Sequence, residues 1–449
     1  MAKKKQIELT IEEKLQNALV PKEEQPYKIP SNWCWIRLEN IAEWGSGGTP
    51  SRKRKEYYNG NIPWIKTGEL NNGYIFNSEE KITELGLKNS SAKLYPINTV
   101  IIAMYGATIG KVGILSIEAT TNQACACAIV YKNILFKYVF HYLIYQKEAF
   151  INKSKGGAQP NLSQEIIKKH EIPLPPIKEQ QRIVNRIESL FAKLDRAKEL
   201  IENTLAQFEQ NKMAILHKAF IGELIAKWRK ENNIDLSSWE KIKLGKVLLP
   251  MQTKKPTGQF FRYIDIDAID NKRQIVKAPK LILTEKAPSR ASRGVETGNI
   301  LFSMVRPYLK NIAQIDSDLS DCIASTGFYV CRCKPELNSR FLYYLFIFDK
   351  TIDYLMQFMK GDNSPSIRKD DLLNMKIDLP TIEEQQEIVN ILDNLLAKYN
   401  KIKNLEQQLE KIELLKKAIL AKVFRGELGT NNPDEESAEN LLKEILAEK

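Results

Sequence analysis

The sequence is poor in the residues from which most metal and thiol sites are built. Its 449 residues include only three histidines and six cysteines. Cys125-x-Cys127 and Cys331-x-Cys333 lack the two-residue gap and the second pair of a zinc site. We therefore expect no metal site, and we expect these cysteines to be small residues in strands of a protein from a reducing cytoplasm.

Long apolar runs are also missing. No stretch of 18 residues is free of charge and apolar, so no membrane-spanning helix is expected. The first 14 residues are basic and polar without an apolar segment, which argues against a secretory signal. These absences predict a cytoplasmic protein.

Signatures of catalysis are absent too. There is no Gly-x-Ser-x-Gly elbow. The turn Gly106–Lys111 has three residues between its glycines, and Val112 stands where a phosphate loop needs Ser or Thr. The tetrapeptide 174–177, Leu-Pro-Pro-Ile, lacks the polar and aromatic ends of an adenine methyltransferase motif. We expect neither an enzyme nor a cofactor site in this chain.

Acidic residues are fewer than basic ones, with 55 Asp and Glu against 67 Lys and Arg, a net charge of +12. The segment from Thr430 to the end has six acidic and two basic side chains, so residues 1–429 carry +16. This excess favours a polyanionic partner such as nucleic acid.

What the sequence does contain is a long internal repeat. Residues 174–185 match 379–390 at an offset of 205, and 214–224 match 418–428 at an offset of 204. Upstream, 31–38 matches 237–244. Each repeat reads as a globular module followed by a long helix, with an α+β fold. The intervening segments differ, either because an old duplication has drifted or because each module recognises something different.

The two expected helices have coiled-coil spacing. Apolar residues recur at steps of four and three from Ile183 to Ile201 and from Ile388 to Ile402. Thr381 and Glu384 form a capping box at the second start. We expect the helices to pair antiparallel within the chain, with a pseudo-twofold axis between the repeats; two separate helical hairpins are the alternative.

Loops of the first module carry cations, hydroxyls and amides that suit DNA. A Gly-Gly-Thr-Pro loop precedes four consecutive cations, a strand precedes the turn at Gly106, and a proline turn lies near Pro160. Phosphate contacts and base contacts both use such side chains, although a solvated loop or plain turn chemistry explains them too. The predicted DNA-binding residues here are Thr49, Ser51, Arg52, Lys53, Arg54, Lys55, Lys66, Thr67, Tyr105, Thr108, Lys111, Gln159 and Asn161.

The second module has counterparts at the same places. Met304 falls opposite Met104, and an arginine after it could bind guanine through two hydrogen bonds, with a plain surface cation as the alternative. The predicted DNA-binding residues here are Arg293, Arg306, Tyr308, Lys310, Asn363, Ser364 and Ser366.

Together these residues resemble the specificity subunit of type I restriction–modification systems. The Gly-Gly-Thr-Pro-Ser loop and residues 62–70 resemble the opening of a target-recognition domain. Residues 172–184 with their copy, and the Phe-x-Gly-Glu-Leu motifs at 220–224 and 424–428, resemble the ends of the two family spacer helices. The likeness covers nearly the whole chain but is weak in the second module, which has no Gly-Gly-Thr-Pro near Met251.

The resemblance implies a division of labour. Each recognition domain would read one half of a bipartite site in double-stranded DNA, and the helices would set the spacing. Two methylation subunits would dock and carry the S-adenosylmethionine chemistry, and restriction subunits would join them. The expected division is an N-terminal segment at 1–30, recognition domains at 31–173 and 231–378, spacer helices at 174–230 and 379–428, and an acidic segment at 429–449.

Two other functions stay open on the sequence alone. One is a nucleic-acid-modifying enzyme with a divergent active site in the modules. The other is a coiled-coil scaffold, which the duplicated aromatic-rich modules make less attractive.

Overall fold

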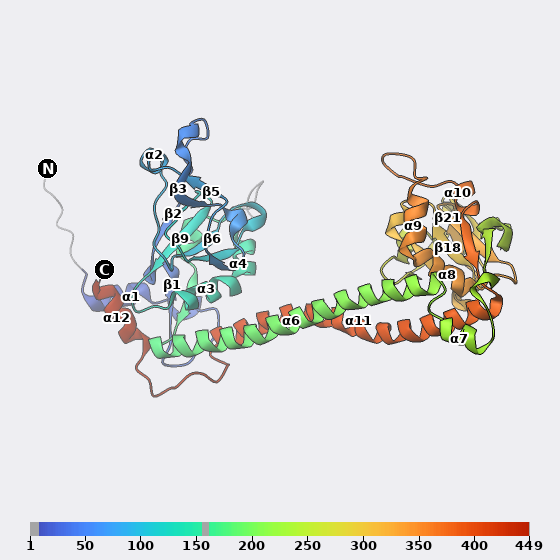
Figure 1. Ribbon diagram of the computed structural model, residues 1–449. Helices are drawn as coiled ribbons and strands as arrows, with labels where there is room; N and C mark the ends of the chain where they lie inside the picture. The colour runs from blue at the N-terminus through green and yellow to red at the C-terminus, as the bar shows by residue number, and fades with distance from the viewer. Residues whose placement is uncertain (1–8, 155–160, 449) are drawn as a thin grey trace. The chain divides into compact units, whose positions relative to one another are not determined.

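The computed structural model describes residues 9–154 and 161–448, without the side chains of 236, 396 and 398–404. The chain forms two compact units (Figure 1). Unit 1 is Met1–Glu199 with Gln408–Lys449, and unit 2 is Leu200–Gln407. Each unit contains one module and a part of each long helix.

The first module is built from a five-stranded sheet in the order β2-β9-β6-β7-β4 and a three-stranded sheet in the order β5-β3-β8. A further pair, β1-β10, joins the two ends of the module. The strands are β1 (Cys34–Arg37), β2 (Ala42–Ser46), β3 (Tyr58–Ile65), β4 (Gly73–Ile75), β5 (Glu80–Ile82), β6 (Val100–Ala103), β7 (Val112–Leu115), β8 (Thr120–Thr121), β9 (Cys125–Val130) and β10 (Glu171–Leu174). The helices are α2 (Glu84–Lys88), α3 (Phe136–Tyr145), α4 (Lys147–Lys153) and α5 (Gln164–Lys168).

The second module repeats this topology. The order β12-β21-β18-β19 corresponds to β2-β9-β6-β7, and β16-β13-β20, extended by β17, corresponds to β5-β3-β8. The strands are β11 (Glu240–Lys243), β12 (Leu248–Leu249), β13 (Phe260–Ile264), β14 (Ile269–Asp270), β15 (Ile275–Val276), β16 (Lys280–Leu283), β17 (Ala291–Gly294), β18 (Ile300–Ser303), β19 (Ile312–Gln314), β20 (Ile323–Ser325), β21 (Phe328–Cys333) and β22 (Lys376–Leu379). The helices are α8 (Ser339–Ile347), α9 (Asp349–Met356) and α10 (Lys369–Leu373), with α7 (Ala226–Glu231) just before the module.

Continuous apolar strands hold the first module together because they are buried on both faces. In β6, Val100 and Ile102 pack with Tyr138 of α3, whereas the alternate residue Ile101 packs with Ile65 in a second cluster. Side chains of successive strand residues point to opposite faces, so one strand serves both layers.

The second module uses the same arrangement. Ile300 and Phe302 of β18 pack with Phe341 of α8, and Leu301 packs with Ile264 on the other face. This agreement in topology and burial, between segments of dissimilar sequence, confirms that the chain is a duplication with an α+β fold.

The long helices are α6 (Ile177–Phe220) and α11 (Ile382–Phe424), of 44 and 43 residues. The one-residue difference accounts for the change of offset from 205 to 204. Seam residues Ile183, Ile187, Ile388 and Leu392 are fully buried. The predicted capping box is present: the Glu384 carboxylate accepts from the N–H of Thr381 at 3.1 Å, and the Thr381 hydroxyl accepts from the N–H of Glu384 at 3.3 Å.

Within unit 1 the two helices run antiparallel. Lys416 contacts Asp195 at 2.5 Å, and Lys198 contacts Glu413 at 3.4 Å. The partner number falls by three as the residue number rises by three, which is the signature of antiparallel neighbours. The predicted pairing of the helices is confirmed, and the alternative of two separate hairpins is wrong.

The two ends of the described chain meet in unit 1. Helix α1 (Ile11–Ala18) packs against α12 (Ala438–Glu448), as Figure 1 shows. Leu15 and Leu442 belong to the same core cluster. The C-terminal segment therefore contributes apolar residues to the core of unit 1, while most of its acidic side chains are exposed.

Candidate nucleic-acid interface

The Gly-Gly-Thr-Pro loop of the first module is fixed against the segment between β8 and β9. The backbone N–H of Gly48 donates to the carbonyl of Thr121 at 2.9 Å, and the hydroxyl of Thr49 bonds the side chain of Gln123. A Cβ on Gly47 would lie 2.1 Å from the Thr121 carbonyl oxygen. The close approach that these glycines permit is thus to the chain itself.

The same segment forms backbone hydrogen bonds with two further stretches that carry predicted DNA-binding residues. The N–H of Asn122 donates to the carbonyl of Ile65, next to Lys66, and the N–H of Met104 donates to Ala124, each at 2.9 Å. We call residues 121–124 the first hub. It brings the loops before β3, after β3 and after β6 to one place.

The predicted hairpin turn follows β6. Residues Gly106–Thr108 form a single 3-10 turn between the antiparallel strands β6 and β7. Tyr105 is 40% exposed and bridges to Asn161, and the hydroxyl of Thr108 donates to the carbonyl of Tyr105 at 2.9 Å. The turn therefore joins Tyr105, Thr108, Lys111 and Asn161; Gln159 lies outside the described residues.

Two of the predicted cations are engaged within the module. Arg52 contacts Glu80 at 2.5 Å and lies over the rings of Tyr58 and Trp64, at 4.4 and 4.9 Å. Lys66 contacts the same carboxylate at 3.1 Å. Hydrogen bonds from these cations lower the pKa of Glu80, and the Glu80 carboxylate raises the pKa of Arg52. Both cations brace the loop against β5.

The other predicted residues of this stretch face solvent to a greater degree. Ser51, Lys53, Arg54 and Lys55 are exposed, and Thr67 is half-buried at the start of a short turn. Arg54 has an exposed carboxylate neighbour, Glu56, at 3.6 Å. Lys53 and Lys55 are the cations of this loop most open to an incoming phosphate.

The second module forms a matching turn after β18. The N–H of Arg306 donates to the carbonyl of Pro365 at 2.8 Å, and its guanidinium donates to the carbonyl of Asn363 at 2.9 Å. Val305 bridges to Ser366 as Tyr105 bridges to Asn161. The structure thus brings Arg306 beside the exposed Asn363 and Ser364, with Tyr308, 42% exposed, in the same turn.

Lys310 and Arg293 are less exposed than Arg306 and Tyr308. The Lys310 ammonium donates to the carbonyl of Ile347 at 3.1 Å and bonds the carboxylate of Asp349. Arg293 is half-buried on β17, and its Nε, within the described part of the chain, has no hydrogen-bond partner. Lys310 thus ties the turn to the end of α8 and the start of α9.

The structure adds residues that the sequence did not single out. The segment Ser325–Gly327 is the second hub: Met304 N–H donates to Gly327, and Thr326 N–H donates to Arg290, each at 2.9 Å. The exposed side chains beside the hubs are Gln123, Arg290 and Thr326. A polar pair between two apolar strands, as at Asn122-Gln123, is the signal that could have located the first hub.

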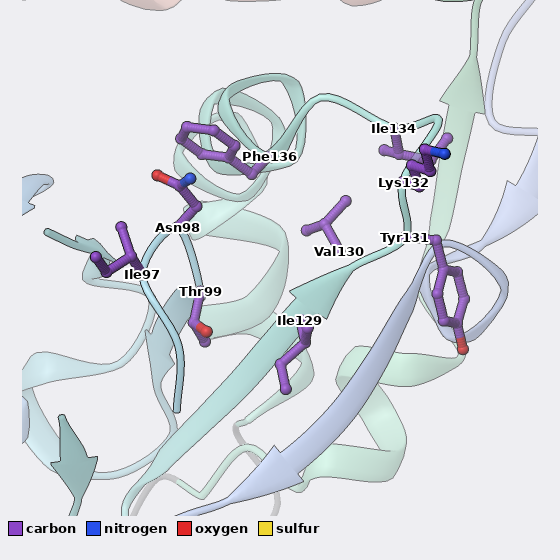
Figure 2. Close-up of a pocket in the computed structure, with 9 residues that line it drawn as sticks. All are labelled: Ile97, Asn98, Thr99, Ile129, Val130, Tyr131, Lys132, Ile134 and Phe136. Carbon is purple, nitrogen blue, oxygen red and sulfur yellow. The ribbon is translucent and has the colours of Figure 1, made fainter. Parts of the chain in front are cut away.

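One cavity lies away from these loops. A cavity of about 280 Å³ is lined by the end of β9, the approach to β6 and Phe136 of α3 (Figure 2). None of the predicted DNA-binding residues lines it. A second cavity, of about 410 Å³, includes Lys310 in its lining together with Gln274 and Leu216.

The cysteines are free thiols in or beside strands. Cys125 and Cys127 lie in β9, Cys331 and Cys333 in β21, and burial raises the pKa of Cys127 to about 12. Their prediction as strand residues is confirmed. Over residues 9–154 and 161–448, no group of three His, Cys, Asp or Glu side chains is placed to hold a metal ion. In the same stretches no helix has the length and apolarity to cross a membrane.

Comparison with known proteins identifies this architecture. The model of the type I restriction modification DNA specificity domain matches residues 30–207 and again residues 239–414. The chain belongs to this family and carries its domain twice. Its function is that of a DNA specificity subunit of a type I restriction–modification system, a class whose role is recognition rather than catalysis.

Curated relatives agree along most of the chain. The MjaIX specificity subunit of Methanocaldococcus jannaschii is 26% identical over 436 residues, covering 89% of this chain and 94% of the relative. The EcoKI specificity subunit of Escherichia coli K12 is 23% identical over 451 residues, covering 94% and 96%. The EcoR124I/EcoR124II specificity subunit of Escherichia coli is 35% identical over 156 residues, covering 33% of this chain and 39% of the relative.

Solved structures share the fold. A chain from a study of complex assembly and conformational transition of the type I R-M system matches with a TM-score of 0.67 at 21% identity. The HsdS subunit of Thermoanaerobacter tengcongensis matches with a TM-score of 0.55, also at 21% identity. Each match covers 90% of this chain and 100% of the other.

Proposed function

We propose that each module recognises one half of a bipartite site in double-stranded DNA through the loops at its hub. The observation that carries this proposal is one loop framework present twice with different side chains. Tyr105, Thr108 and Lys111 occupy the turn in one module, and Arg306 and Tyr308 occupy it in the other. Two unlike recognition surfaces on one chain suit a target whose halves differ.

The exposed cations supply affinity without sequence preference. Lys53 and Lys55 lie in the loop that leads to the first hub, and Arg290 lies beside the second. Contacts of lysine and arginine with phosphate fix the position of a protein on the duplex, and contacts with base edges select the sequence. We assign the loop cations before β3 to phosphates and the turns after β6 and β18 to bases.

The remaining parts of the chain serve the assembly. We propose recognition domains at 31–173 and 231–378, with the helical segments 174–230 and 379–428 setting the spacing between the half-sites. Curated relatives are subunits of restriction enzymes. We therefore propose that two methylation subunits dock on this chain and bring the S-adenosylmethionine chemistry, that restriction subunits join the complex, and that it acts in the cytoplasm.

Methylation mapping tests this function directly. Genomic DNA from a host with its complete restriction–modification genes is compared with DNA from the same host lacking this gene. We expect a methylated motif with two specified parts and an unspecified spacer, which disappears with the gene. A motif that persists without the gene, or a single uninterrupted motif, would contradict the proposal.

Exchange of one module sharpens the test. Replacing residues 231–378 by the corresponding part of another family member should change one half of the motif and leave the other half and the spacer length intact. The reciprocal exchange of residues 31–173 is the matched control and should change the other half. Simultaneous change of both halves in either chimera would contradict independent recognition.

A further inference from the structure

The turn after β18 is built in a backbone conformation that its residues disfavour. In the described part of the chain, seven non-glycine residues have a positive φ. Four are asparagines, which tolerate the left-handed region better than most residues. The others are Gln274, Arg306 and Lys310, with φ of 52°, 49° and 50°. Two of these three lie in one turn of the second module.

The same turn in the first module has glycine at both places. Gly106 and Gly110 have φ of 64° and 75°, and each stands 200 residues before its counterpart. The supporting bonds match as well: Ala103 N–H donates to Lys111 at 2.9 Å, and Ser303 N–H donates to Asn311 at 3.1 Å. One backbone geometry is thus made with unstrained glycines in one module and with two cations in the other.

Contacts of its side chain explain why a lysine can occupy the left-handed position 310. The Lys310 ammonium is held by the Ile347 carbonyl at the end of α8 and by Asp349 at the start of α9. A glycine at this position would lose both bonds. The left-handed conformation of Lys310 is therefore compensated within the fold.

Among the residues that the structure describes, the side chain of Arg306 has one bond to a carbonyl and no carboxylate partner. The bond from Arg306 N–H to Pro365 belongs to the backbone, and a glycine would keep it. Arg306 is exposed, and its guanidinium donates one hydrogen bond, to the Asn363 carbonyl at 2.9 Å. Four of its five N–H donors are left. Strain that the surroundings do not require is typical of functional positions.

We propose that Arg306 is a specificity-determining residue that binds the major-groove edge of one guanine in the half-site of the second module. The guanidinium offers a planar pair of donors that matches O6 and N7 of guanine. Its bond to Asn363 holds the side chain over the turn, and the ammonium of Lys310 fixes the other end. This inference rests on the proposed function, and it names one residue that reads the DNA and the base that this residue contacts.

The test is the variant Arg306→Gly, mapped by methylation in a host with its complete restriction–modification genes. Glycine keeps the left-handed backbone, so the melting temperature should stay the same or rise by about 2 °C. We expect the motif to lose preference for guanine at one position of one half, by about tenfold to a hundredfold. Arg306→Lys, which retains charge without the planar pair of donors, should relax the same position.

The matched control is Asn233→Gly, which changes an exposed residue of the same unit with φ of 54°. It should leave the motif unchanged. An unchanged motif in Arg306→Gly, relaxation in both halves, or a melting temperature lowered by several degrees would overturn the inference. A parental chain without any bipartite motif would overturn the proposed function instead, and is a distinct result.

Discussion

The guanidinium of Arg182 donates two hydrogen bonds to the carboxylate of Glu435, at 2.8 and 2.6 Å. Arg182 lies in the first turns of α6, and Glu435 lies in the C-terminal segment, 253 residues later. Arg182 also contacts Glu179, whose side chain is fully buried, at 2.7 Å. One arginine thus ties the end of the chain to the start of the long helix.

Substitutions of this pair should differ in cost. Glu435→Gln should lower the free energy of unfolding of unit 1 by about 1 kcal/mol, because solvent screens the partly exposed guanidinium. Arg182→Gln should cost about 3 kcal/mol, because it also leaves Glu179 buried without its cation. Thermal or denaturant unfolding of the full chain measures both. Asp434→Asn, an exposed neighbouring carboxylate, is the control and should have little effect.

Acid should destabilise unit 1 through two buried histidines. Burial lowers the pKa of His141 to about 4 and that of His170 to about 3, from an ordinary 6.5. The unfolded chain then binds protons that the folded chain rejects, so stability is present above pH 6.5 and is lost as pH falls toward these values. At pH 5 each histidine should cost about 2 kcal/mol.

Unfolding of the full chain at pH 7 and pH 5 tests this effect. The variant His170→Gln removes one titrating group and should halve the pH-dependent loss. The charged neighbours of His170 are Lys153 at 2.9 Å and Glu171 at 3.7 Å, and both remain in that variant. Equal pH dependence in His170→Gln and the parent would show that other groups control the acid transition.

The glycine loop offers a test of the first hub. Gly47→Ala would place a methyl group 2.1 Å from the Thr121 carbonyl, so we expect a loss of about 1–3 kcal/mol. Gly68→Ala, with nothing within 4 Å of the new Cβ, should be tolerated. If the two variants have equal melting temperatures, the close contact between the loop and residue 121 is not present in solution.

The cations of the first module should divide into two groups. Lys53→Ala and Lys55→Ala should weaken DNA binding at all sequences alike, each lowering the slope of log affinity against log salt by about one. Arg52→Ala should instead lower the stability of the module, since it removes the Glu80 contact. Binding titrations at several salt concentrations and thermal unfolding separate these effects. A change of methylation motif in Lys53→Ala would contradict its assignment to a phosphate.

The duplication was predictable because its copies still match at 174–185 and 379–390, and the helices were predictable because their signals are local. The spacing at Ile183 and Ile388, the capping box at Thr381 and the apolar strand 100–103 each act through neighbours in sequence. The predicted equivalence of Met104 and Met304 is confirmed. The N–H of Met104 donates to the turn before β9, and the N–H of Met304 donates to the equivalent turn before β21.

The pairings that form the hubs were not predictable from one sequence, because they join residues far apart in the chain; the Asn122-Gln123 pair marks only the position of the first hub. Nothing local indicates that Gly48 meets Thr121, or that Arg52 and Lys66 converge on Glu80. The four consecutive cations look alike in the sequence, whereas in the structure Arg52 contacts a carboxylate and lies over two aromatic rings. The left-handed turn was hidden as well, because Arg306 and Lys310 replace the glycines that would have marked it.

The bonds that assemble the first hub run from main chain to main chain: Gly48 to Thr121, Asn122 to Ile65, and Met104 to Ala124. Such bonds do not depend on which side chains the loops carry. Exposed positions beside them are therefore free to vary at little cost to stability. Under the proposed function, point substitutions at these positions would change the DNA target while the scaffold stays folded, so the architecture would allow rapid diversification.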